Sequence, residues 1–122
     1  MNIAIDLDDT ITYAPETFAA LTQMLGRKNY IYIITNRNPD TRANTVKELE
    51  DFRIVYDNLI LTADKKKAIL ENEIDIFFED TDEYFLDLPE EVLVFKIREP
   101  GNFNFAEKKW IYGNKTGINI DD

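Results

Sequence analysis

The chain of 122 residues contains neither cysteine nor histidine. Without cysteine it forms no disulfide, has no thiolate nucleophile and builds no cysteine-based zinc site. Without histidine it lacks every hydrolytic arrangement in which an imidazole activates a serine or a cysteine. Its chemistry must therefore come from carboxylates, amines, guanidinium groups, hydroxyls or a metal ion bound by oxygen atoms.

Positive charge is also scarce, because 14 lysines and arginines stand against 24 acids and leave a net charge of −10. Such a charge repels nucleic acids and anionic membranes. We therefore expect no extended nucleic-acid binding and no membrane association, although a single phosphate group held through a metal ion is compatible with it. No apolar run approaches the length of a membrane span, and acids stand where a signal peptide would carry basic residues. We expect a cytoplasmic protein.

The hydrophobic pattern alternates between strands and helices. Short apolar, β-branched or aromatic runs predict five strands, at residues 2–7, 30–34, 58–61, 74–78 and 92–97. Apolar residues at helical spacing predict helices between them, at about residues 15–25, 39–49, 64–72 and 81–88. Beyond residue 100 the pattern weakens, and we predict only a small hairpin around Trp110 to Tyr112 with Gly113-Asn114 as its turn.

Strands that alternate with helices are connected by right-handed crossovers and form a mostly parallel sheet. We therefore predict an α/β fold, a Rossmann-like three-layer sandwich around a five-stranded sheet. The length allows one domain over residues 1–122, with a core at about 2–97 and an extension at about 98–122. The stretches 8–35 and 35–80 have room only for core elements, so we expect no cap domain.

Charged and hydroxyl side chains follow the first, second and fourth predicted strands, and three lysines open the helix before the fourth. The residues are Asp6, Asp8, Asp9 and Thr10; Thr35, Asn36 and Arg37; Glu79 and Asp80; and Lys65, Lys66 and Lys67. In open α/β sheets, sites form at the carboxyl ends of the strands, where the strand order reverses. We therefore expect these side chains to share one site.

These residue types suit phosphoryl transfer. Paired carboxylates and loop carbonyls form an oxygen-only site that suits Mg²⁺, and the ion lets a carboxylate approach a phosphate as nucleophile. A second carboxylic acid can protonate the leaving oxygen and later deprotonate the attacking water. A lysine and a hydroxyl can hold the phosphoryl oxygens.

Four motifs resemble those of the haloacid-dehalogenase-like superfamily, in the right order and spacing over about residues 2–97. DLDDT after an apolar strand is similar to the first motif, IYIITNR to the second, the lysine cluster to the third and IDIFFED to the fourth. The acid two residues after the first aspartate favours the phosphatases of this superfamily. The Thr-x-Arg of the second motif most resembles the small 5′(3′)-deoxyribonucleotidase-like members.

The resemblance implies a Mg²⁺-dependent phosphohydrolase that acts through an aspartyl-phosphate, on a (deoxy)nucleotide or another phosphate ester. Asp6 would be the nucleophile, and Asp8 would be the general acid and base, with its backbone carbonyl also on the metal ion. Thr35 and one lysine would hold the phosphoryl group. Lys65 has the better spacing for this role, and Lys66 follows closely.

The resemblance also implies the metal ligands Asp6, Asp8 and Asp80. Tyr84 stands where the fourth motif often carries a second acid or asparagine, so Glu79 or Asp82 is expected to assist. Substrate contacts are expected from residues beside the strand ends, namely Asp9, Thr10, Asn36 and Arg37. Because a capless site is open to water, the resemblance implies a large substrate, such as a phosphorylated end, or a lid from a partner subunit in a homo-oligomer.

Two other functions stay open. Receiver-like signalling modules also combine acids after the first strand with a threonine and a lysine, although their phosphoacceptor ends the third strand, where this chain has Leu61-Thr62-Ala63. A non-catalytic binding protein on the same scaffold is the other alternative, because fold does not determine function. Arg37 more readily pairs with a surface acid than contacts a substrate, and Trp110 and Tyr112 are more readily packing residues than a substrate platform.

Overall fold

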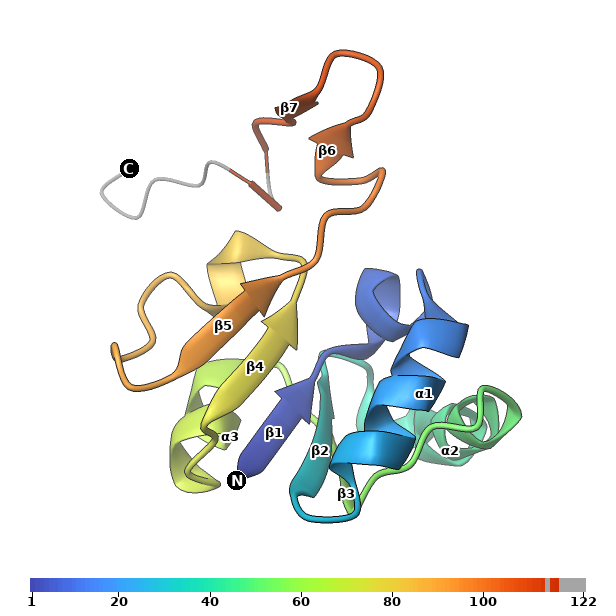
Figure 1. Cartoon of the computed structure of the whole chain (residues 1–122). Helices are drawn as coiled ribbons and strands as arrows, with labels where there is room; N and C mark the ends of the chain where they lie inside the picture. Colours follow the sequence, from blue (N-terminus) through green and yellow to red (C-terminus); the bar gives the residue numbers. More distant parts are fainter. Residues whose placement is uncertain (114, 117–122) are drawn as a thin grey trace.

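A parallel five-stranded sheet forms the centre of the computed structural model, which describes residues 1–113, 115 and 116 (Figure 1). The strand order is β3-β2-β1-β4-β5, and every neighbouring pair is parallel. The strands are β1 (Asn2–Ile5), β2 (Tyr30–Thr35), β3 (Asn58–Leu61), β4 (Ile76–Glu79) and β5 (Leu93–Lys96). The α/β class and the parallel sheet predicted from the sequence are confirmed.

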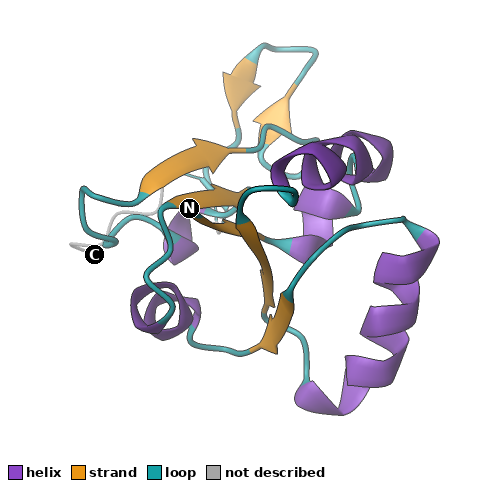
Figure 2. Cartoon of the chain, turned by 60° about the horizontal axis from the view of Figure 1, so that its bottom comes forward, coloured by secondary structure: helices purple, strands orange, loops and turns teal. Residues whose placement is uncertain are grey.

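Helices cover both faces of this sheet (Figure 2). They are α1 (Pro15–Leu25), α2 (Arg42–Asp51) and α3 (Lys65–Glu71). Ile3 and Ile5 of β1 share one core cluster with Phe18 of α1 and Leu49 of α2, whereas Ala4 points to the other face and packs with α3. Burial of each large apolar side chain stabilises the fold by roughly 1.5–3 kcal/mol. Within the described residues, no helix has the length and apolar character needed to cross a membrane.

The order of the strands reverses between β1 and β4. The chain runs outward from β1 through β2 to β3 and then returns to place β4 on the other side of β1. The carboxyl ends of β1 and β4 therefore diverge into connections on opposite faces of the sheet, which leaves a crevice between them. Only helical turns and core elements occur in the described stretches 6–35 and 36–79, and no cap domain is inserted there.

The predicted helix at 81–88 is wrong, because only one turn, Asp82–Tyr84, is helical. Its amides bond three residues back, from Tyr84 to Thr81 and from Phe85 to Asp82, in the manner of a 3₁₀ turn. Thr81 makes no side-chain cap hydrogen bond, unlike Asp64 at the equally short α3, so little offsets the cost of starting a longer helix here. Tyr84, Phe85 and Leu88 pack against the sheet instead.

The extension carries a short antiparallel hairpin of β6 (Phe103–Asn104) and β7 (Lys109–Trp110), which stands above the carboxyl ends of the sheet (Figure 1). Trp110 lies in the second strand and the turn comes before it, so the predicted arrangement of the hairpin is wrong. Gly113 pairs with Thr116 in an isolated bridge, and Asn114 lies outside the described residues. Phe103 packs edge-to-face with Trp110, which explains this register better than the Gly-Asn turn signal did.

Candidate active site

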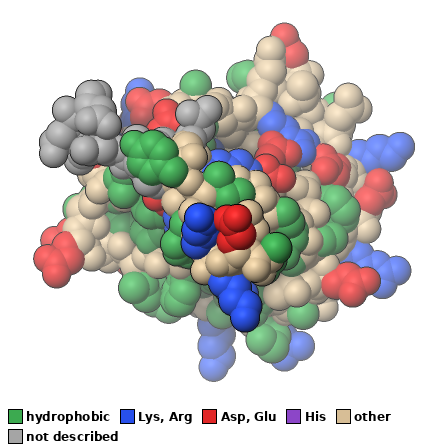
Figure 3. Space-filling view, turned by 90° about the horizontal axis from the view of Figure 1, so that it is seen from above, with side chains coloured by type: hydrophobic (Ala, Val, Ile, Leu, Met, Phe, Trp, Pro, Cys, Tyr) green, Lys and Arg blue, Asp and Glu red, His purple; other side chains and the backbone are tan. Residues whose placement is uncertain are grey.

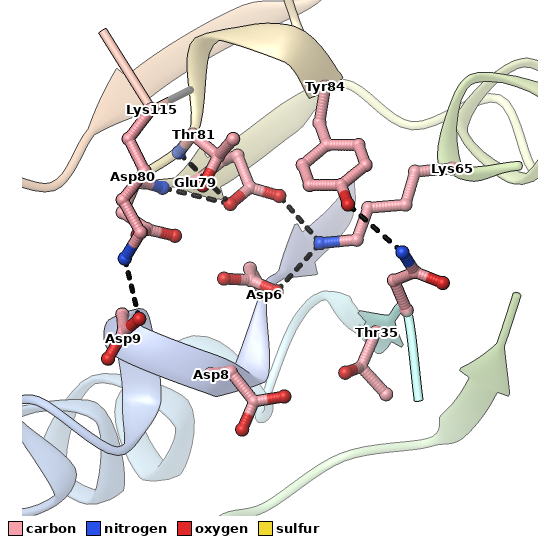
Figure 4. Close-up of a pocket in the computed structure, with 11 residues that line it drawn as sticks. Asp6, Asp8, Asp9, Thr35, Lys65, Glu79, Asp80, Thr81, Tyr84 and Lys115 are labelled. Atoms are coloured by element: carbon pink, nitrogen blue, oxygen red, sulfur yellow. Dashed lines mark hydrogen bonds and ion pairs between the residues drawn. The ribbon is translucent and has the colours of Figure 1, made fainter. Parts of the chain in front are cut away.

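A pocket lies where the strand order reverses between β1 and β4, over the carboxyl ends of β1, β2 and β4 (Figure 4). Its lining residues are Asp6, Asp8, Asp9, Thr35, Asn36, Lys65, Glu79, Asp80, Thr81, Tyr84 and Lys115. Seen from above, acidic, basic and hydrophobic side chains are interspersed on this face of the molecule (Figure 3). The sheet thus brings together most of the residues singled out in the sequence.

Asp6 lies at the centre of the pocket because it directly follows β1. Its amide donates to the carbonyl of Phe78 in β4 (3.0 Å), which continues the parallel pairing one residue past the strand. Its carboxylate is buried and receives the Nζ of Lys65 on Oδ1 at 2.7 Å. Burial raises the pKa of Asp6 to about 6, although Lys65 opposes that shift. Asp6 is therefore mostly a carboxylate at neutral pH.

Lys65 bridges two buried acids. Its Nζ lies 2.7 Å from Asp6 and 2.7 Å from Glu79, and the ring of Tyr84 covers it at 4.1 Å from the ring centroid (Figure 4). Burial by itself lowers the pKa of Lys65, but Asp6 and Glu79 outweigh it and raise the pKa above its ordinary value. The ammonium is therefore a fixed positive charge beside Asp6.

Both oxygens of Glu79 are engaged. Oε1 accepts from Lys65, and Oε2 accepts from the backbone amides of Asp80 (3.0 Å) and Thr81 (3.3 Å). Burial, followed by repulsion from Asp6, raises the pKa of Glu79 to about 9. Its present contacts hold Lys65 and the loop after β4 in place, and its predicted role as a metal ligand stays a prediction.

The hydroxyl of Thr10 lies between the carboxylates of Asp6 and Asp80. Its buried hydroxyl lies 3.0 Å from Asp6 Oδ2 and 3.4 Å from Asp80 Oδ1. Burial by itself raises the pKa of Asp80, but hydrogen bonds from its neighbours, Lys115 among them, hold the pKa below its usual value. Thr10 does not line the pocket, so the expectation that it contacts substrate is wrong, and it orients carboxylates instead.

The oxygen atoms around Asp6 and Asp80 fit a divalent cation. One oxygen from each of Asp6, Glu79 and Asp80 lies within 4.8 Å of the others, and all three residues are buried. Asp6 Oδ2 and Asp80 Oδ1 face the single hydroxyl of Thr10, whereas the other oxygen of each carboxylate binds an ammonium, that of Lys65 or Lys115. A set of ligands made only of oxygen suits a hard ion such as Mg²⁺.

Asp8 lies at the rim of the pocket and is held by Arg37. The guanidinium binds both carboxylate oxygens, with Nε 3.1 Å from Oδ2 and Nη2 2.6 Å from Oδ1. Glu48 of α2 (2.7 Å) and Thr45 (3.3 Å) orient the same guanidinium from behind. These hydrogen bonds, above all those that Arg37 donates to Asp8, raise the pKa of Arg37 beyond its already high value.

Arg37 does not line the pocket, so the structure gives it the role of orienting Asp8 in place of the expected substrate contact. Asp9, next along the loop, adopts a left-handed conformation (φ 63°) that turns the chain from β1 towards α1. Its amide donates to Thr12 Oγ1 (2.8 Å), and its carboxylate is exposed at the mouth of the pocket.

The structure distinguishes the two candidate lysines. Lys65 reaches Asp6, whereas Lys66 turns about 100° around the helix and pairs with the exposed Asp87 at 3.0 Å. Asp64 caps α3 by accepting from the amide of Lys67 and so sets this orientation. The candidacy of Lys66 is therefore wrong, and its ammonium belongs to the solvated face of the helix.

Thr35 presents an unsatisfied hydroxyl to the pocket. It ends β2, is fully buried and lines the pocket, yet its Oγ1 has no hydrogen-bond partner among the described residues. Such a group costs about 1–3 kcal/mol unless a ligand or water satisfies it. Asn36 beside it donates to the hydroxyl of Tyr84 (3.1 Å), which links the ends of β2 and β4 across the pocket.

Lys115 and Glu99 complete the site, and sequence reasoning missed both. The Nζ of Lys115 lies 2.5 Å from Asp9, 2.9 Å from Asp80 and 3.0 Å from Glu99. Burial by itself lowers the pKa of Lys115, but hydrogen bonds to these three carboxylates raise it above its ordinary value. The extension showed no clear pattern, and 106 residues separate Lys115 from Asp9, so no local signal marked the contact.

No family model matches the chain, and no curated protein does. Solved structures similar in fold include "Structure of Pnkp1/Rnl/Hen1 complex", with 18% identity and a TM-score of 0.61, and "Structure of the Pnkp1/Rnl/Hen1 RNA repair complex", with 18% identity and a TM-score of 0.64. Each match covers 79% of this chain but only 45% and 42%, respectively, of the other. At this identity the likeness shows the fold alone.

Proposed function

We propose that the chain is a Mg²⁺-dependent phosphohydrolase that transfers a phosphoryl group first to Asp6 and then to water. The observation that carries the proposal is the meeting of the Asp6 carboxyl group, the Lys65 ammonium and the unsatisfied Thr35 hydroxyl in one pocket. A nucleophile, a cation and a hydrogen-bond donor are the groups that a phosphoryl group requires.

Asp6, Asp80 and the carbonyl of Asp8 would hold the magnesium ion, which, when bound, would neutralise phosphate charge. In the first step a carboxylate oxygen of Asp6 forms a bond to phosphorus while the bond from phosphorus to the leaving oxygen breaks. Asp8 gives that oxygen its proton, which it carries when one of its oxygens is released from Arg37. Lys65 and Thr35 bind the phosphoryl oxygens throughout.

In the second step a water oxygen attacks phosphorus and the bond to Asp6 breaks. Asp8 takes the proton from this water, so phosphate leaves and both carboxyl groups return to their starting states. Arg37, fixed by Glu48, keeps Asp8 at the rim where the leaving group and the water must pass. The same acid therefore serves both proton transfers.

A large phosphate ester fits the open site better than a small enclosed one, since no cap domain covers it in the described stretches. The two solved structures similar in fold belong to a complex described as an RNA repair complex. Phosphorylated oligonucleotide ends are therefore substrates to test beside mononucleotides. With the net charge of −10, we expect contact with the end of the strand and not along its length.

The test is phosphate release from an aryl phosphate, mononucleotides and end-phosphorylated oligonucleotides, with Mg²⁺ and with EDTA. We expect release only with Mg²⁺, and a loss of at least about 10³-fold in Asp6→Asn, which removes the nucleophile but keeps its shape. Asp87→Asn, on the exposed partner of Lys66, is the matched control and should retain activity.

Wild-type turnover by Asp6→Asn would rule out the aspartyl-phosphate mechanism. A phosphoprotein that forms from small phosphate donors and persists for minutes would instead indicate a receiver-like module. Binding of Mg²⁺ with no hydrolysis of any ester would indicate a non-catalytic protein on this scaffold.

A further inference from the structure

The extension returns to the pocket through the residues around Lys115. The carbonyl of Lys115 accepts from the amide of Asp82 (2.9 Å), and Thr116 Oγ1 accepts from Lys96 Nζ (3.0 Å). Asn102 anchors the start of the extension, because its buried amide group donates to the carbonyls of Asp80 (2.9 Å) and Ile97 (2.8 Å). A distant part of the chain is thereby held against the loop that carries Asp80.

The ammonium of Lys115 occupies a cluster of three carboxylates. Asp9, Asp80 and Glu99 each offer one oxygen, and these oxygens lie within 4.8 Å of one another, a spacing that suits a metal ion. The Nζ of Lys115 binds all three, although its own side chain stays 28% exposed. The positive charge at this cluster therefore comes from Lys115, whose side chain is partly exposed to solvent.

Asp80 belongs to two acidic clusters at once. It shares one cluster with Asp6 and Glu79, and the other with Asp9 and Glu99. Lys115 takes its Oδ2, and Thr10 lies beside its Oδ1. A divalent ion bound at Asp6 and Asp80 would have to share this carboxylate with an ammonium, and two cations at neighbouring oxygens repel each other.

On the proposed site of Mg²⁺ at Asp6 and Asp80, we propose that Lys115 is a built-in competitor of the metal ion. The ammonium neutralises Asp80 when no ion is present, and binding of the ion displaces the ammonium together with the residues around it. The contact of Lys115 with Asp9 and Asp80 is then made in the metal-free protein, which we call the closed state, and is released in the metal-bound protein.

If Lys115 competes with Mg²⁺, its contacts should lower the affinity of the protein for the ion, because the ion must break them in order to bind. The apparent affinity is reduced by the fraction of molecules that are closed. Lys115→Met should therefore bind Mg²⁺ at least about fivefold more tightly than the wild type, the lower end of typical coupling between sites. Isothermal titration with Mg²⁺ alone measures this affinity without any turnover.

Trp110 reports the displacement directly. It is the single tryptophan of the chain, and Lys96 Nζ lies 4.0 Å from its ring centroid while also binding Thr116. Release of Thr116 changes the surroundings of Lys96 and thus the emission of Trp110. We expect Mg²⁺ to change this emission in the wild type, with a midpoint equal to the calorimetric one, and to have little effect in Lys115→Met.

Two variants make the test specific. Lys109→Met removes the same charge from the hairpin, where Lys109 pairs with Glu107 at 3.3 Å, and should leave the affinity unchanged. Glu99→Gln weakens the hold on Lys115 while keeping the lysine, so it should tighten Mg²⁺ binding. If Glu99 were itself a ligand of the ion, this substitution would weaken binding instead.

Wild-type or weaker Mg²⁺ affinity in Lys115→Met, or weaker affinity in Glu99→Gln, would overturn the proposal. So would tighter binding by Lys115→Met if Mg²⁺ left the Trp110 emission of the wild type unchanged, because the ammonium would then only repel the ion. A chain that shows both signals but hydrolyses no ester would refute the proposed activity alone, so the two failures are distinguishable.

Discussion

The hydroxyl of Thr35 makes no hydrogen bond that stabilises the described fold, but it is placed where a ligand could bind it. Its hydroxyl is buried at the end of β2 without a hydrogen-bond partner among the described residues. Asp6 and Lys65, in contrast, satisfy each other in the absence of ligand. A residue that carries an uncompensated polar group at a pocket is a candidate for contact with an anion, because the ligand supplies the missing partner.

Substitution of Thr35 by valine should separate function from stability. We expect kcat/KM for phosphate release to fall about 10²-fold, the usual effect of losing one donor to the transferring group. The free energy of unfolding should stay constant or rise by roughly 1 kcal/mol, because valine keeps the β-branched shape without the unsatisfied oxygen. Steady-state kinetics and urea denaturation measure the two effects.

Thr22→Val is the matched control. Thr22 is equally buried, but its hydroxyl accepts from the amide of Val55 (3.1 Å), so its loss should destabilise the fold by about 1–3 kcal/mol and leave kinetics intact. A marked loss of stability in Thr35→Val would mean that the hydroxyl already has a partner.

At the scale of elements, helix α3 turns one lysine into the site and the next away from it. The cap at Asp64 sets where the helix begins, and each residue then advances about 100° around the axis. The side chain of Lys65 consequently reaches Asp6 in the pocket, whereas that of Lys66 lies in solvent and pairs with Asp87. The two adjacent lysines make a matched pair for mutagenesis.

Lys65→Met should abolish activity, and Lys66→Met should leave it within about twofold of the wild type. We also expect the first variant to lose about 3–5 kcal/mol of stability, because it leaves Asp6 and Glu79 buried without their cation. The second removes only an exposed ion pair, worth about 0–1 kcal/mol. Thermal denaturation and phosphate release on both proteins test the contrast, which equal effects would contradict.

The balance of charge at the scale of the whole molecule makes stability depend on pH. The chain carries a net charge of −10, and Asp6, Glu79 and Asp80 are buried together where the strand order reverses. Burial raises the pKa of Glu79 from 4.5 to about 9 and that of Asp6 from 3.8 to about 6. Unfolding exposes both groups to water, where their pKa values return to the ordinary range.

The sign of this dependence follows from the protons bound in each state. Between pH 4.5 and about 9, folded Glu79 holds a proton that the unfolded chain releases, so the free energy of unfolding falls as pH rises. The contribution is fully present below pH 4.5 and is lost as pH passes about 9. In EDTA, we expect the stability of the wild type relative to Glu79→Gln to fall across this window.

Urea denaturation of both proteins at several pH values from 5 to 9 checks the prediction, and the slope for one proton cannot exceed about 1.4 kcal/mol per pH unit. A constant difference between the two proteins would show that Glu79 stays ionised in the fold. Repeating the series with Mg²⁺ should flatten it, because a cation near Asp6 favours the ionised carboxylates.

Residue patterns along the chain were enough to predict five strands and their mostly parallel pairing. They also singled out Asp6, Thr35 and Asp80 as candidate site residues. The reason is that apolar periodicity reports burial locally, and acids placed just after buried strands meet at one edge of a parallel sheet. The two predictions that were wrong, the helix at 81–88 and the arrangement of the hairpin, also have local causes. The stretch 81–88 starts without a side-chain cap and stands directly before a proline, and the hairpin is set by packing of Phe103 on Trp110.

The tertiary structure alone decided which side chains face one another at the site. Helix phase selected Lys65 over Lys66, and α2 turned Arg37 onto Asp8 through Glu48. Lys115 reaches Asp9 across 106 residues of sequence. Contacts of this kind depend on the packing of elements and on the path of the extension, and such long-range geometry leaves no periodic trace in the order of the residues.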